Sequence, residues 1–154
     1  YASSPDHNKD QSSSIQAMNA MQVFLNKYPG SEFMSKAVEV ITLSQEKLEK
    51  KGFENAKQYL KLEMYKGAIV AFDDFKKNFP DSKYLEEAAY LKVVAEFELA
   101  KVSIPSKQLE RYTTTLEYYK ELVDNFPNSP FLKEAQRFYT ESLNQVNKLN
   151  NFKI

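Results

Sequence analysis

The feature that most constrains the fold is a proline-centred segment that occurs three times in the chain. The copies are residues 24–37 (FLNKYPGSEFMSKA), 75–88 (FKKNFPDSKYLEEA) and 122–135 (LVDNFPNSPFLKEA), which align without gaps. All three keep the aromatic residue before the proline, the proline, the serine two residues later and the closing alanine. A motif repeated in this way indicates repeated supersecondary units that stack on one another.

Each copy combines a helix stop with a helix start. Pro29, Pro80 and Pro127 lack the N–H that a continuing helix needs, and each disfavours helical geometry in the residue before it. The turn residue and serine that follow are typical of an N-cap, because a serine hydroxyl accepts an unpaired N–H. We therefore expect helix–helix junctions near residues 29–31, 80–82 and 127–129.

Between the junctions the apolar residues recur at helical spacing, as Ala68, Phe72, Phe75 and Phe79 do. Only three glycines are present, too few for the many turns of a strand-rich protein. The sequence predicts an all-α protein, a superhelical array of about six helices over residues 12–28, 31–63, 65–79, 82–101, 108–126 and 129–150. We expect one α-solenoid domain over residues 1–154, a bend near Gly52 and a loop at residues 102–107.

Composition excludes several function classes. The 21 basic and 21 acidic residues cancel, so no overall field favours nucleic acid. The absence of cysteine excludes disulfides, thiolate metal sites and cysteine nucleophiles. The single histidine, His7, stands in a polar segment without a spaced ligand partner or nucleophile, and we expect it at the surface. We expect no catalytic site, no metal and no cofactor.

The residues before Pro80 have the spacing of the tetratricopeptide repeat, a hairpin of two helices. Ala56, Tyr59, Ala68, Phe72 and Phe75 occupy its apolar positions. The three prolines lie 51 and 47 residues apart, whereas the consensus repeat has about 34 residues, so these hairpins are enlarged.

The order of the motifs carries a narrower resemblance. The succession SPDHNKDQ, YPGSEF, AFDDFKKNFPDSKYLEEA and YYKELVDNFPNSPFLKEA resembles the C-terminal repeats of the BamD family in its Bacteroidetes variant, repeat lipoproteins of the outer-membrane β-barrel assembly machinery. The resemblance implies a non-enzymatic scaffold at the periplasmic face of the outer membrane. It implies docking on a transport-associated domain of a barrel-assembly outer-membrane protein, with other assembly lipoproteins as further partners. The only membrane attachment implied is an N-terminal lipid anchor, and we expect this sequence to be the C-terminal part of a longer lipoprotein that carries it.

Two other functions fit the same sequence. One is a generic tetratricopeptide adaptor that binds peptides in its groove. The other is a helical lipoprotein of the envelope that binds a substrate or polysaccharide. The sequence upstream of Tyr1 would discriminate among the three, because a lipoprotein signal, a cysteine and two further repeats would favour the assembly scaffold.

The partner-binding candidates lie where the second and third helices meet. Lys57, Lys61, Tyr65 and Lys66 combine basic side chains with a tyrosine in a tight turn, and tyrosine is common at interfaces. If that fails, we expect the interface around Arg111, Tyr112 and the 102–107 loop.

The same lysines belong to a stripe that faces the concave groove in tetratricopeptide folds. Its members are Lys50, Phe53, Lys57, Leu60 and Lys61. Three lysines on one stripe predict an acidic partner. The alternative is a solvated face on which the lysines pair with Glu46, Glu49 and Glu54 at neighbouring helical turns.

Overall fold

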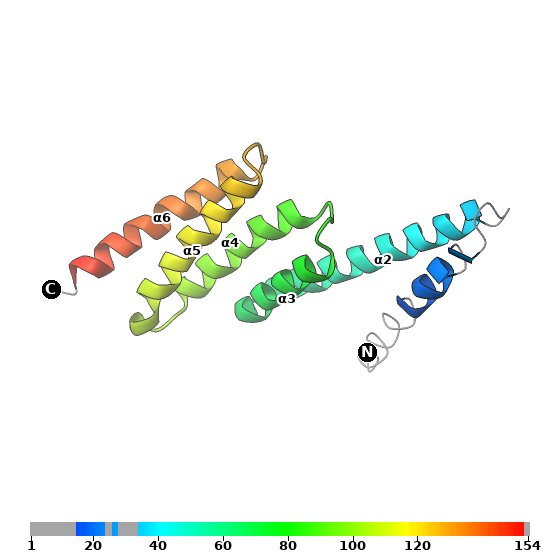
Figure 1. Ribbon diagram of the computed structural model, residues 1–154. Coiled ribbons are helices and arrows are strands. Elements are labelled where there is room, and N and C mark those ends of the chain that lie inside the picture. Colours follow the sequence, from blue (N-terminus) through cyan, green and yellow to red (C-terminus); the bar gives the residue numbers. More distant parts are fainter. Residues whose placement is uncertain (1–14, 24–25, 28–33, 153–154) are drawn as a thin grey trace. The chain divides into compact units, whose positions relative to one another are not determined.

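The computed structural model describes residues 15–23, 26–27 and 34–152, and within these residues the chain forms only helices and turns (Figure 1). The helices with defined bounds are α2 (Met34–Lys61), α3 (Tyr65–Asn78), α4 (Leu85–Lys101), α5 (Pro105–Asn125) and α6 (Leu132–Asn151). Residues 15–23 and 26–27 are also helical. The predicted all-α fold is confirmed. His7 and the first junction, residues 29–31, lie outside the described residues.

The chain divides into two compact units, Tyr1–Lys51 and Gly52–Ile154. The boundary falls within α2, which continues as a helix through Gly52. The single solenoid domain and the bend at Gly52 stay predictions. The candidate binding surfaces all belong to the second unit.

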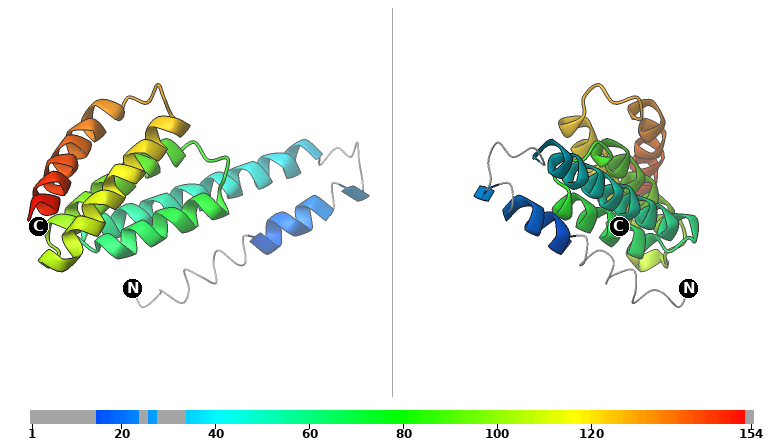
Figure 2. Two further views of the ribbon diagram at one scale, coloured as in Figure 1. Left: turned by 60° about the vertical axis from the view of Figure 1, so that its left-hand side comes forward. Right: turned by 90° about the vertical axis from the view of Figure 1, so that its right-hand side faces the viewer.

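Helix α4 is the centre of the second unit. It packs against α3, α5 and α6, and α5 also packs against α6 (Figure 2). A helix with neighbours on several sides is apolar around most of its circumference. Accordingly, α4 buries Ala88, Val93, Ala95, Phe97 and Ala100. The half-buried Tyr118 of α5 borders both hydrophobic clusters of the unit.

The second and third junctions share one geometry. Ser82 Oγ accepts the N–H of Tyr84 at 3.0 Å, and Ser129 Oγ accepts the N–H of Phe131 at 3.1 Å. An i→i+3 bond from the Leu85 N–H to the Ser82 carbonyl adds one tight turn before the α-helix. Helices α4 and α6 therefore begin at Leu85 and Leu132, three residues later than predicted.

The motif's closing alanine is a core residue in each copy. Ala37, Ala88 and Ala135 are 4%, 4% and 0% exposed. A small side chain at this position allows neighbouring helices to approach closely, which explains why the three copies share it.

The predicted loop at residues 102–107 is too long. Pro105 is the first residue of α5, so the connection consists of residues 102–104. Proline suits the first helical position, because its fixed φ matches the helix and no N–H partner is needed there. The proline therefore starts a helix where the sequence interpretation placed a helix break.

Candidate partner-binding surfaces

Two turns lie at one end of the second unit, as both Figure 1 and Figure 2 show. Residues 62–64 join α2 to α3, and residues 102–104 join α4 to α5. Helices α3 and α4 pack against each other. Burial raises the pKa of the Tyr65 phenol at the start of α3, and the charges of Glu63 and of Glu98, near the end of α4, raise it further. Tyr65 is the first residue of α3, as the predicted helix over residues 65–79 has it, so it follows the tight turn and is not part of it.

The two turns carry four exposed large apolar side chains. Leu62 is 58% exposed, Met64 51%, Val102 69% and Ile104 64%. We call these four residues the turn patch. Four exposed lysines lie within three residues of them in the sequence: Lys61, Lys66, Lys101 and Lys107. Large exposed apolar side chains with charged neighbours are typical of an interaction site.

The predicted lysines differ in their surroundings. Nζ of Lys57 lies 3.9 Å from a carboxylate oxygen of Glu54, 3.9 Å from one of Glu87 and 5.2 Å from the Phe53 ring centroid. Lys57 therefore fits the alternative of a paired, solvated face. Within the described part of the chain, Lys61 and Lys66 are exposed and form no ion pair.

Two residues expected at an interface belong to the core. Phe53, assigned to the concave groove, is 2% exposed and stacks on Tyr84 with ring centroids 4.8 Å apart. Tyr112 is 4% exposed and meets Phe97 edge to face at 6.1 Å. Both predictions are wrong about the side chain's position, because these rings fill spaces between helices.

Arg111 stabilises the turn at residues 102–104 through a hydrogen bond. Its guanidinium donates a hydrogen bond to Ser103 Oγ, which donates to the Leu99 carbonyl. This chain of bonds fixes the segment that presents Val102 and Ile104. Arg111 is thus placed to position the turn patch.

The sequence interpretation missed the turn patch itself. Leu62, Met64, Val102 and Ile104 stand in short connections that normally carry polar or glycine residues. Apolar residues in two turns of neighbouring hairpins were the signal that could have found it.

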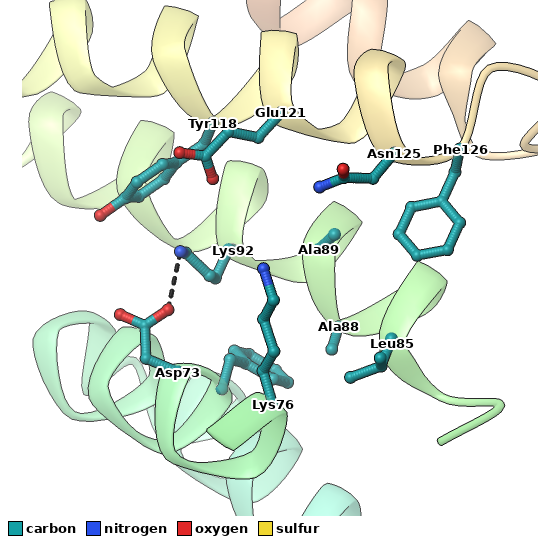
Figure 3. A pocket seen from close by; sticks show the side chains of 11 residues that line it. Asp73, Lys76, Leu85, Ala88, Ala89, Lys92, Tyr118, Glu121, Asn125 and Phe126 are labelled. Carbon is teal, nitrogen blue, oxygen red and sulfur yellow. Dashed lines mark hydrogen bonds and ion pairs between the residues drawn. The ribbon is translucent and has the colours of Figure 1, made fainter. Parts of the chain in front are cut away.

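A second surface is a groove between α3 and α5, with α4 as its floor (Figure 3). Its cavity has a volume of about 200 Å³. The apolar lining consists of Phe72, Leu85, Ala88, Ala89 and Phe126. The two alanines leave the groove open, because a larger side chain on α4 would fill the space between α3 and α5.

One end of the groove is closed by a bridge across the three helices. Lys92 Nζ lies 2.7 Å from Asp73 Oδ1 and 4.1 Å from the ring centroid of Tyr118. Burial raises the pKa of Tyr118 to about 12, assisted by the charges of Glu96, Asp73 and others, so its phenol is neutral at physiological pH.

Each wall of the groove carries one charged side chain that has no ion-pair partner among the described residues. The side chain of Lys76 extends from α3 into the groove, and that of Glu121 extends from α5 toward Tyr118 (Figure 3). Both residues are exposed, and neither forms an ion pair with another described residue. Asn125 adds a neutral amide to the α5 rim.

These surfaces are suited to binding. In the described part of the chain, no three histidine or acidic side chains gather in a way that could hold a metal ion. None of the described helices combines the length and apolar character that a membrane crossing requires.

The chain matches a known protein family. The family model for YfiO, described as an outer membrane lipoprotein, matches residues 1–70 and 54–148. No curated protein matches the chain significantly. The two matched ranges overlap and together cover nearly the whole sequence.

Proposed function

The chain belongs to the YfiO family of outer membrane lipoproteins, and from this premise we propose that it is a non-enzymatic scaffold of the outer-membrane β-barrel assembly machinery. Its place in the cell is then the periplasmic face of the outer membrane. Its partner is a transport-associated domain of a barrel-assembly outer-membrane protein, with other assembly lipoproteins as further partners. The narrower resemblance to the Bacteroidetes variant stays a prediction.

The observation that supports docking is the turn patch with its adjoining lysines. Each of its four side chains is more than half exposed, so association would remove apolar surface from water. Lys61 and Lys66 flank this surface and form no ion pair with any residue that the structure describes, and they favour an acidic rim on the partner. The predicted edge of Lys57, Lys61, Tyr65 and Lys66 thus becomes the border of an apolar contact.

The test is direct binding of the purified transport-associated domain to the full chain, measured by calorimetry. Met64→Asp and Ile104→Asp each place a charge in the apolar contact, so we expect each to weaken binding at least tenfold, or about 1.4 kcal/mol. Both side chains are exposed, so the folded state should tolerate the change.

The matched control is Val70→Asp, because Val70 is 59% exposed on α3 but lies outside the turn patch. It should bind like the wild type. Undiminished binding by folded Met64→Asp and Ile104→Asp would show that the partner docks elsewhere. No binding by the wild type would contradict the proposed partner itself.

A further inference from the structure

We propose that the groove between α3, α4 and α5 is a second docking site, which receives a short segment of a partner protein. The segment carries one large apolar side chain between an acidic and a basic residue. This inference does not depend on the proposed docking of the turn patch, because the two surfaces share no residue.

The size of the groove favours a side chain over a small molecule. Pockets for small-molecule ligands have volumes of roughly 300–1,000 Å³, whereas this one has about 200 Å³. A space of this size suits a single phenylalanine, leucine or methionine. Anchoring side chains of this kind, enclosed in an apolar pocket, provide most of the binding energy in many interfaces.

The length of the groove limits the segment. Leu85 and Lys92 mark its two ends on α4, and seven residues of helix correspond to about 10 Å. The partner therefore contributes about two helical turns or three extended residues. The bridge of Asp73, Lys92 and Tyr118 closes one end, so the segment cannot run through along α4.

The charges of the groove fix the segment's chemistry. Lys92 and Asp73 already satisfy one another, but Lys76 and Glu121 lack ion-pair partners among the described residues. An acidic residue beside the anchor would pair with Lys76, and a basic residue on its other side would pair with Glu121. Opposite charges on the two walls also determine the segment's orientation.

The test uses random peptides displayed on phage and selected on the full chain. We expect enriched peptides to share one phenylalanine, leucine or methionine with an acidic and a basic flank. Ala89→Phe fills the groove and should weaken their binding at least tenfold. Val70→Phe adds the same side chain on the exposed surface of α3 and should leave their binding unchanged.

A charge-exchanged chain provides an independent test. Lys76→Glu combined with Glu121→Lys alters only exposed side chains, so it should fold even if Ala89→Phe does not. Selection on this chain should yield peptides whose flanking charges are exchanged.

Several results would overturn the proposal. They are an absence of enriched peptides, equal binding to folded Ala89→Phe, and the same flanking charges on the exchanged chain. Ala89→Phe should still bind the transport-associated domain through the turn patch, so failure of the groove and failure of the proposed function give different results.

Discussion

At the scale of single residues, the most unusual environment is that of Glu96 on α4. The residue is 6% exposed. Burial raises the pKa of its carboxyl group, Arg111 and Lys92 lower it, and Glu110 raises it. The net shift is upward, so the two cations do not fully compensate the cost of burying the charge.

We predict that Glu96→Gln reduces the dependence of stability on pH. Because the folded-state pKa is raised, the folded chain holds this proton more tightly than the unfolded chain does. The contribution of Glu96 to the free energy of unfolding is fully present below the ordinary glutamate pKa. It is lost as the pH rises through the raised pKa of the folded state. Glutamine has no such loss, so its stability relative to the wild type should increase with pH.

Urea unfolding of both proteins at a series of pH values measures this difference. Glu96→Asp keeps the charge and serves as the control. A difference between wild type and Glu96→Gln that stays constant from acidic to neutral pH would contradict the prediction.

At the scale of helices, local sequence predicts where elements exist better than where they begin. The three junctions can be predicted from sequence because proline lacks the N–H that a continuing helix needs. Helices α3 and α5 accordingly end within one residue of the predicted positions. The starts of α4 and α6 are displaced, because a serine hydroxyl stabilises an additional tight turn. Pro105 shows the same ambiguity, since proline can either end a helix or begin one.

The candidate sites depend more strongly on tertiary structure. The lysines near residue 61 could be identified from sequence, but whether each is paired depends on residues such as Glu87 on another helix. The groove exists because α3 and α5 both pack on α4 but not on each other. No local pattern encodes that separation.

Helices α2 and α3 approach each other closely at Gly67 and Tyr59. A Cβ added at Gly67 would lie 3.1 Å from Cδ1 of Tyr59. Alanine favours the helix by about 1 kcal/mol over glycine, while overpacking costs about 1–3 kcal/mol. We expect Gly67→Ala to lower the free energy of unfolding by up to about 2 kcal/mol, measured by urea denaturation.

The Tyr59→Leu background isolates this contact. Removing the aromatic ring should make Gly67→Ala neutral or stabilising, and the double-mutant cycle gives the coupling. An equal loss of stability in both backgrounds would show that the contact with Tyr59 is not the cause.

At the scale of the whole molecule, stacked hairpins should lose structure together. Ala88 on α4 is 4% exposed and belongs to the same hydrophobic cluster as Phe72 and Phe75 of α3. We predict that Ala88→Glu unfolds more than one hairpin, because an unpaired buried charge costs several kcal/mol at a contact between neighbours.

Hydrogen exchange followed by mass spectrometry measures which helices respond. Amides of α3, α4 and α5 should lose protection together in Ala88→Glu. The exposed Val70→Glu should leave protection unchanged. Loss confined to α4, or wild-type melting, would contradict the prediction.

The charge of the whole chain bears on how a partner would be captured. Since the 21 positive and 21 negative charges cancel, only local groups can accelerate encounter. Lys57 is paired with Glu54 and Glu87, whereas Lys61 and Lys66 are not paired among the described residues. We therefore expect reversal of Lys61 and Lys66 to glutamate to slow association several-fold, and reversal of Lys57 to slow it less. Ile104→Ala and Tyr65→Ala should mainly hasten dissociation, because they remove contact area without changing charge.

Surface plasmon resonance at two salt concentrations separates the two effects. At high salt the association rates of the wild type and the lysine variants should converge, whereas the dissociation rates should stay different. Equal slowing by Lys57 and Lys61 reversals, or association rates insensitive to salt, would show that unpaired lysines do not guide the encounter.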